Sequence, residues 1–233
     1  MEEILAREKV ISSNEYIVGS VPTVFYIPDY IAAAEENQLL NNIYQAPISK
    51  WKSLKNRRLQ NWDLPPWLKK FTCRIYEESK LFLSPINHVL INEYLPDQGI
   101  MAHQDGPAYV PVVAILSLGS PVVMEFAPHS RFENAGNSNG DTVSDERLRE
   151  YLPFSVALMP RSLLIFKDEA YSDYLHGIKE CVNQRYNEAV NITSVVNNNG
   201  EAGGDDAVIH RTRTRVSLTC RIVKKVHKNL IKF

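Results

Sequence analysis

Hydrophobic positions follow two different periods along this chain, and the change comes near residue 87. Before it, residues 29–46 repeat apolar side chains at helical spacing, with Leu39 and Ile43 on one stripe. Residues 65–78 show the same spacing behind two prolines, which fit the first turn of a helix. From residue 87 onward, short apolar runs rich in β-branched residues predict strands. The pattern therefore predicts two early helices and a β-rich remainder.

The expected strands are short and numerous. They cover residues 24–27, 87–94, 109–118, 121–126, 154–159, 162–166 and 208–223. Many short strands that follow a helical section are typical of layered β architectures. We expect a mainly β (α+β) fold, specifically a double-stranded β-helix or jelly roll with the N-terminal helices packed outside.

Polar stretches without a core-forming period divide the chain. Residues 1–20 are expected to form a flexible N-terminal arm, and residues 21–233 a single domain. Within that domain, residues 127–150 and 179–210 are rich in Asn, Gly and charged side chains. Such composition predicts two loop insertions.

Composition and charge narrow the choice of partners and location. The formal net charge is −1, so any site for a polyanion must be a local patch. Three widely spaced cysteines without a Cys-x-x-Cys pair favour a reducing compartment. The N-terminus lacks the apolar core of a signal peptide, and the longest apolar run is too short to cross a bilayer. We expect the cytoplasm and nucleus, no membrane association and no obligate protein partner.

The stretch from Asn92 to Asp105 carries the strongest chemical signal. His103 and Asp105 are two residues apart, and side chains at this spacing point to the same side of an extended strand. Two His and one carboxylate on one face are typical of non-haem Fe(II) oxygenases. Alone, the pair more often marks a surface strand end. Asn92 and Tyr94 precede it at the same spacing, and His176 follows just after a predicted strand.

The last predicted strand has one apolar and one polar face, the polar one formed by Arg215, Ser217, Thr219 and Arg221. That face either meets water, which is usual for a sheet, or lines a cavity inside an open barrel. Beside an iron site the cavity is favoured, because the carboxylate of a bound cosubstrate would need a cation. A guanidinium binds a carboxylate through two parallel hydrogen bonds and stays charged when desolvated.

Residues 50–62 are rich in cations and tryptophan, with five cations within nine residues. Aromatic planes stack on bases and cations hold phosphates, so this composition suits single-stranded nucleic acid. Composition alone favours equally a solvated hairpin whose tryptophans pack on the core. The candidate substrate-binding residues of this segment are Lys50, Trp51, Lys52, Arg57, Arg58 and Trp62.

Together these residues resemble the AlkB family of Fe(II)- and 2-oxoglutarate-dependent dioxygenases. The family order is Asn-x-Tyr, His-x-Asp, a distal His and two arginines six residues apart. The matching residues are Asn92, Tyr94, His103, Asp105, His176, Arg215 and Arg221. Segments similar to the sixth AlkB homologues of animals and plants are 59–62, 64–68, 87–94, 115–120, 160–165 and 214–219. The resemblance extends from residue 22 to residue 223.

The resemblance implies Fe(II), 2-oxoglutarate and O2 as cofactors, and a role for each matching residue. The implied metal ligands, which are also the catalytic residues, are His103, Asp105 and His176. The residues implied to contact the cosubstrate are Asn92, Tyr94, Arg215 and Arg221. Of these, Arg215 pairs with the distal carboxylate, and Arg221 closes the cosubstrate site and faces the substrate. Residues 47–66 resemble the substrate-facing lid of the family.

The implied reaction is oxidative demethylation of nucleic acid, in which succinate, carbon dioxide and formaldehyde leave. Single-stranded DNA or RNA is preferred, because a base in a duplex must first be flipped out. Two departures concern substrate recognition. Repair-type members have an acidic residue where this chain has Pro107, and the lid is shortened after Trp62.

Three functions stay open at this point. A nucleic-acid demethylase is favoured by the basic segment with its tryptophans. A dioxygenase that hydroxylates or demethylates a protein or small molecule is favoured by the near-zero net charge and by Pro107. A non-enzymatic nucleic-acid-binding module is disfavoured, because a spent site has no need to keep iron and cosubstrate ligands together.

Overall fold

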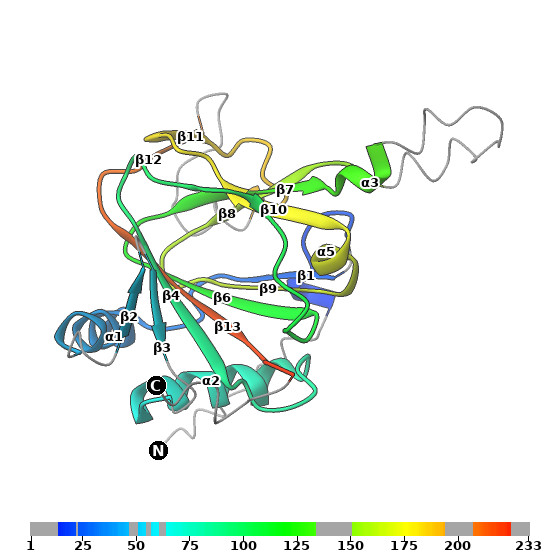
Figure 1. The fold of residues 1–233 in the computed structure, drawn as a ribbon. Coiled ribbons are helices and arrows are strands. Elements are labelled where there is room, and N and C mark those ends of the chain that lie inside the picture. Colours follow the sequence, from blue (N-terminus) through cyan, green and yellow to red (C-terminus); the bar gives the residue numbers. More distant parts are fainter. Residues whose placement is uncertain are drawn as a thin grey trace, which may run out of the picture.

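Two antiparallel sheets, one of seven strands and one of four, form the body of this computed structural model (Figure 1). The structure describes residues 14–21, 23–46, 51–54, 57–60, 64–133, 151–193 and 207–224. Aromatic side chains of both sheets meet between them, with the rings of Phe126 and Phe166 centred 5.4 Å apart. This arrangement confirms the predicted jelly roll.

The strand order shows how distant parts of the chain become neighbours. The larger sheet runs β1 (Val24–Ile27), β9 (Leu163–Lys167), β6 (Val112–Leu118), β13 (Arg215–Arg221), β4 (His88–Tyr94), β3 (Arg57–Gln60) and β2 (Trp51–Leu54). The smaller sheet runs β5 (Ile100–His103), β10 (Tyr174–Ile178), β7 (Val122–Pro128) and β8 (Phe154–Leu158). The last long strand, β13, therefore lies at the centre of the larger sheet, between β6 and β4.

Two helices cover the outer face of the larger sheet, as the sequence predicted. α1 (Ala33–Gln45) and α2 (Pro66–Ser79) pack their apolar stripes against the outward side chains of that sheet in one hydrophobic core (Figure 1). α1 begins later than expected, because Asp29 has φ 43° and Ala32 is still extended. Within the described residues, no helix combines the length and the apolar character needed to cross a membrane.

The chain around the predicted insertions is more regular than expected. β11 (Asn183–Arg185) and β12 (Val208–His210) pair as a small antiparallel sheet, so residues 179–210 contain more than a loop. The single strand expected at 208–223 is instead two strands, β12 and β13. In the other insertion, β7 extends to Pro128 and a short helix, α3 (Ser130–Glu133), follows. Residues 134–150 and 194–206 lie outside the described residues.

The structure describes only part of the predicted arm and part of the predicted lid. Of residues 1–20, the described part contains a short 3-10 helix, η1 (Asn14–Tyr16), and a bridge from Ile17 to Phe25. Of residues 47–66, β2 and β3 form a hairpin that pairs with β4 at the edge of the larger sheet. The division of the chain into arm, domain, lid and insertions stays a prediction.

A buried carboxylate on α1 fixes the turn between β6 and β7. Glu36 accepts a hydrogen bond from the backbone N–H of Gly119 at 2.8 Å, and its other oxygen lies 3.5 Å from Arg161 Nη1. Gly119 has φ +80°, and a Cβ there would lie 2.6 Å from the carbonyl oxygen of Thr214. The turn thus contacts the residue that precedes β13 and helps to set the position of that strand.

We expect Glu36→Ala to lower the free energy of unfolding by about 1–3 kcal/mol, because the Gly119 N–H loses its partner. Gln38→Ala, at an exposed position on the same helix, should change it by less than about 0.5 kcal/mol. Urea unfolding of both variants measures the difference. Equal effects would show that Glu36 contributes no more than an ordinary surface residue.

Candidate active site

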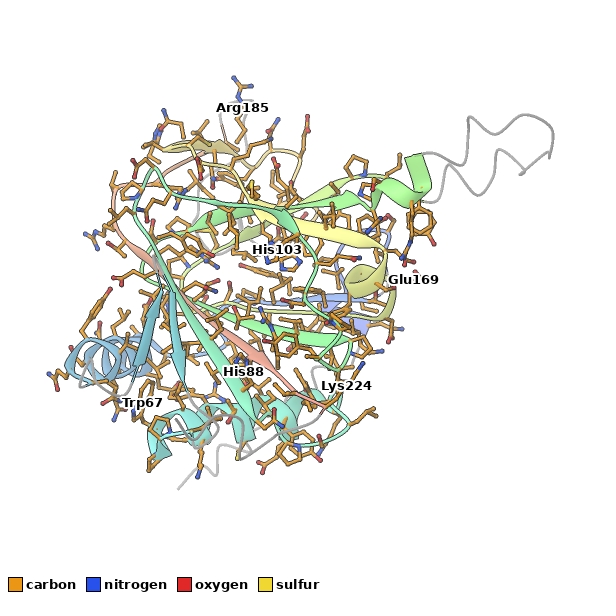
Figure 2. All side chains as sticks on the ribbon, viewed as in Figure 1. Trp67, His88, His103, Glu169, Arg185 and Lys224 are labelled. Atoms are coloured by element: carbon orange, nitrogen blue, oxygen red, sulfur yellow. The ribbon has the colours of Figure 1, made fainter. Side chains whose placement is uncertain are left out.

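The structure brings His103, Asp105 and His176 together from two neighbouring strands. His103 ends β5, and it lies opposite His176 of β10 in the antiparallel register. One potential ligand atom from each of the three side chains lies within 4.8 Å of the others. His176 follows the predicted strand, which is β9, but it lies inside a further strand, β10, that was not predicted. Figure 2 shows His103 between the two sheets.

Hydrogen bonding and burial set how the two imidazoles can bind a metal. His103 Nδ1 lies 2.9 Å from the carbonyl oxygen of Met101, so Nδ1 donates to that oxygen and Nε2 is the nitrogen left to bind an ion. Burial, together with the charges of His103 and Arg221, lowers the pKa of His176 to about 3. A neutral imidazole is the ligating form, since a protonated ring offers no lone pair.

Short-range contacts hold the loop that carries Asp105. A Cβ on Gly177 would lie 2.9 Å from the backbone nitrogen of Ala102, so a glycine lets β10 approach β5 closely. The Gln104 side-chain amide donates to the carbonyl of Ser172, at the end of the short helix α5 (Asp168–Ser172). The Tyr171 hydroxyl, on the same helix, donates to the carbonyl of Gly106 at 3.3 Å. The helix α5 was not predicted from the sequence.

A cavity of about 150 Å³ lies between the sheets beside these three residues. Its lining includes every residue predicted to bind metal or cosubstrate: Asn92, Tyr94, His103, Asp105, His176, Arg215 and Arg221. Neighbouring strands supply four of them: Asn92 and Tyr94 lie on β4, and Arg215 and Arg221 lie on β13. In the antiparallel register Arg215 lies opposite Tyr94, and Arg221 lies opposite His88. The polar face of the last strand therefore lines a cavity and does not meet bulk water.

Arg215 occupies the closed end of this cavity. It is 1% exposed, its Nη2 donates to the Ser117 hydroxyl at 3.2 Å, and its guanidinium carbon lies 5.7 Å from the centre of the Tyr94 ring. Burial lowers the pKa of Arg215 to about 10, so the group is still charged at neutral pH. No carboxylate among the described residues forms an ion pair with it, and its Nε has no hydrogen-bond partner there.

Asn92 has one half of its amide fixed and the other half available. Its Nδ2 donates to the Thr219 hydroxyl at 3.2 Å across the β4–β13 pair. Its Oδ1 is buried, and no hydrogen bond to it occurs within the described chain. A buried acceptor without a donor is costly unless a ligand or water supplies one. The position suits a polar group bound in the cavity.

Arg221 forms an ion pair with the candidate metal ligand Asp105. Arg221 Nη2 lies 2.8 Å from Asp105 Oδ1, and both side chains are more than nine-tenths buried. The guanidinium also lies over the ring of Tyr109, with its carbon 4.7 Å from the ring centre. These contacts orient the carboxylate that would hold the ion and place a cation at the Asp105 side of the cavity.

Several residues that support the site were missed from the sequence. Arg211, which is 1% exposed, donates to the carbonyl oxygens of Leu95, Gln98 and Cys181 at 3.0, 2.8 and 3.3 Å. It thereby anchors the loop that joins β4 to β5. Arg211 directly follows β12 and lies four residues before β13 begins. The sequence around it has no motif that indicates this role, so only its position in the fold identifies it.

The predicted substrate-binding residues are only partly placed. Lys50 and Trp62 lie outside the described residues. Trp51 and Lys52 belong to β2, and Arg57 and Arg58 belong to β3. Arg57 lies opposite Asn92 in the β3–β4 register, which puts this strand next to the one that carries the cosubstrate candidates.

The residues present fit iron and 2-oxoglutarate on their own chemistry. The cluster of two imidazoles and one carboxylate is the ligand set of non-haem Fe(II) sites. Arg215 Nε and the Asn92 amide oxygen are buried polar atoms that have no hydrogen-bond partner within the described chain. A dicarboxylate between metal and guanidinium would supply a partner to Arg215.

Comparisons with known proteins agree with this geometry. Residues 35–221 match the model of the 2OG-Fe(II) oxygenase superfamily. The chain is 39% identical to Probable RNA/DNA demethylase ALKBH6 of Danio rerio, over 94% of both chains. It is 25% identical to the Alkylated DNA repair protein ALKBH8 homolog of Arabidopsis thaliana, over 88% of this chain and 59% of that protein. The solved structure of OsALKBH1 superposes with a TM-score of 0.51 and 13% identity, over 85% of this chain and 96% of that chain.

Arg215→Met should weaken 2-oxoglutarate binding at least thirtyfold, because truncating one partner of a buried charge pair costs about 2–5 kcal/mol. Iron affinity should change by less than about threefold, since the metal cluster keeps all its ligands. Arg213→Met, at an exposed position before β13, is the matched control. Anaerobic titration calorimetry measures both ligands, and equal loss of the two would make Arg215 a structural residue.

The free energy of unfolding should depend on pH in a way that reveals the lowered pKa of His88. Burial and the charge of Arg221 lower the pKa of His88 to about 4, so its neutral form is favoured by folding. Its contribution, up to about 3 kcal/mol, is present above the unfolded pKa of about 6.5 and is lost as pH falls through 4. Between pH 6.5 and 4, metal-free His88→Asn should lose less stability than the metal-free wild type. If the urea midpoints of His88→Asn and of the wild type change with pH in parallel, His88 does not make this contribution.

Proposed function

The chain belongs to the 2OG-Fe(II) oxygenase superfamily and to its AlkB family, and we propose that it oxidatively removes N-methyl groups from single-stranded DNA or RNA. The family makes it a 2-oxoglutarate-dependent oxidoreductase with Fe(II), 2-oxoglutarate and O2 as cofactors. The observation that carries the proposal is the convergence of the metal and cosubstrate candidates on one cavity. The named activity of the ALKBH6 relative supports nucleic acid as the substrate class.

The site residues divide into three working groups under this proposal. His103, Asp105 and His176 would hold the metal. Arg215 would bind the distal carboxylate of the cosubstrate, and Asn92 and Tyr94 line the same cavity. Arg221 orients Asp105 through the 2.8 Å ion pair.

When bound, iron, 2-oxoglutarate and O2 supply a two-electron oxidation that turns an N-methyl group into N-hydroxymethyl, with succinate and carbon dioxide as co-products. The protein contributes position and exclusion of water. β4 and β13 place the polar groups at fixed register, and the apolar neighbours Ile115, Met124 and Ile178 complete the cavity wall. The hydroxymethyl product then loses formaldehyde and leaves the demethylated nitrogen.

The β2–β3 hairpin is the proposed platform for the nucleic-acid backbone. It extends the larger sheet directly beside β4, so its backbone lies next to the strand that carries Asn92 and Tyr94. Cations and aromatic residues in one segment bind a single strand through phosphates and stacked bases. The proposed substrate-binding residues are Lys50, Trp51, Lys52, Arg57, Arg58 and Trp62.

Location in the cytoplasm and nucleus is part of the proposal. The cysteines Cys73, Cys181 and Cys220 are all free in the structure, which suits a reducing compartment. Nucleic-acid substrates are present in both places.

A second candidate is a dioxygenase that acts on a protein or small molecule. Pro107 stands where repair-type relatives carry an acidic residue, and it is exposed beside the cavity entrance at Gly106. The net charge of −1 gives no general attraction to nucleic acid. This alternative predicts 2-oxoglutarate turnover that methylated oligonucleotides do not stimulate.

The purified protein with Fe(II), 2-oxoglutarate and ascorbate should release formaldehyde from N-methylated single-stranded oligonucleotides. Mass spectrometry should show one methyl lost for each succinate formed. Asp105→Ala should reduce the rate at least a hundredfold, because the metal loses its only carboxylate ligand. Succinate formation without any demethylated oligonucleotide would favour the second candidate.

The salt dependence of binding tests the hairpin. Each phosphate contact in single-stranded nucleic acid contributes about −0.7 to the slope of log affinity against log salt. The triple variant Lys52→Gln, Arg57→Gln and Arg58→Gln should therefore reduce the slope by about 2. Lys69→Gln, Lys70→Gln and Lys80→Gln together, on and next to α2, are the control for net charge. An unchanged slope in the hairpin variant would place the nucleic acid elsewhere.

A further inference from the structure

The cavity has two chemically different ends. Arg215 and Arg221 are six residues apart on β13, so their Cα atoms are separated by about 20 Å of strand. The end at Arg215 is closed, since Ser117 and Tyr94 beside it are buried. The end at Arg221 opens through the exposed residues 106–108. A substrate too large for the closed end must therefore approach at the Arg221 end.

Charge at the open end is positive or neutral. Asp105 is the only carboxylate in the cavity lining that the structure describes, and it is both paired with Arg221 and a candidate metal ligand. The same lining contains two guanidiniums. A positively charged group that enters here meets cations without a carboxylate to balance it, and such a group is strongly disfavoured in a desolvated site.

His88 lies beside this end of the cavity. Alternate residues of β4 share one face, so His88 lies on the same face as Leu90 and Asn92, which line the cavity. Its ring lies 5.5 Å from the ring of Tyr109, and it faces Arg221 across the register. His88 Nδ1 is buried, and it has no hydrogen-bond partner within the described residues.

The surroundings of His88 keep its imidazole uncharged. The charged groups around it are Arg221 on β13 and, beyond that guanidinium, Asp105, while Tyr109 contributes a phenol. Burial and Arg221 both lower the pKa of His88, so the ring offers one N–H donor and one lone pair at neutral pH. A neutral donor and acceptor of this kind matches the edge of an uncharged base.

We infer that the open end of the cavity, lined by Arg221 and Tyr109 with His88 beside them, selects an electrically neutral N-methylated base and rejects a base made cationic by ring methylation. This selectivity rests on the proposed demethylase function. The neutral class comprises bases with the methyl on an exocyclic nitrogen, where the ring keeps no positive charge. His88 and Arg221 act as specificity-determining residues.

Two single-stranded oligonucleotides of one sequence test the inference. One carries an adenine methylated on its exocyclic nitrogen, which is neutral, and the other an adenine methylated on the ring nitrogen N1, which is cationic at neutral pH. The two bases have the same heavy atoms and differ in the position of the methyl group and in charge. We expect kcat/KM for the neutral base to be at least tenfold higher. Competition binding to the metal-free protein should show the same order, independently of turnover.

Two variants of His88 separate charge from shape. His88→Asp adds a carboxylate at this end, and it should reduce the preference for the neutral base at least tenfold. His88→Asn removes the ring without adding charge, and it should leave the cationic base disfavoured. Circular dichroism and thermal melts confirm that both variants are folded. Equal changes in the ratio for Asp and Asn would overturn the role of His88.

The outcomes also separate this inference from the proposed function. Faster demethylation or tighter binding of the cationic oligonucleotide by the wild type would overturn the selectivity and leave the demethylase function intact. Loss of methyl from neither oligonucleotide, with succinate still formed, would overturn the demethylase function and the selectivity with it. A preference for the neutral base in both turnover and binding supports the inference.

Discussion

Two guanidiniums lie on the inner face of β13, and both are almost completely withdrawn from water. Removing such a charge from water costs several kcal/mol unless an anion compensates it. Asp105 provides that compensation for Arg221, whereas Arg215 has the Ser117 hydroxyl and the Tyr94 ring as neighbours. The cavity is therefore built to receive a small anion at its closed end. The dicarboxylate cosubstrate of the superfamily provides one, and its binding would recover part of the energy spent on burying Arg215.

The two sheets hold the residues of the cavity in a defined geometry. β13 lies between β6 and β4, so its register with β4 fixes Arg215 against Tyr94 and Ser217 against Asn92. The smaller sheet contributes the metal candidates, because β5 and β10 place His103 opposite His176. Glu36 and Arg211 hold the turns that lead into these strands. The outer helices bury the apolar side chains on the outward face of the larger sheet.

The sequence predicted most of the site, for a physical reason. A strand repeats every two residues, so the spacings of Asn92 with Tyr94 and of His103 with Asp105 already determine which side chains share a face. The resemblance supplied the pairing of these distant strands, which spacing cannot. Local pattern could not show that Arg221 pairs with Asp105 or that Arg211 bonds three carbonyls, because both depend on contacts far apart in the chain. The break between β12 and β13 was missed, because the residues around it alternate as in a single strand. The helix α5 was missed, because its five residues form no apolar stripe.

The most direct test of this account is anaerobic titration of 2-oxoglutarate into the protein with and without Fe(II). If the metal cluster and Arg215 hold opposite ends of one molecule, the metal-free protein should bind the dicarboxylate weakly. Fe(II) should then tighten that binding at least tenfold, and by linkage 2-oxoglutarate should tighten iron binding by the same factor. Affinities for 2-oxoglutarate that are equal with and without iron would contradict the claim that one cavity holds both.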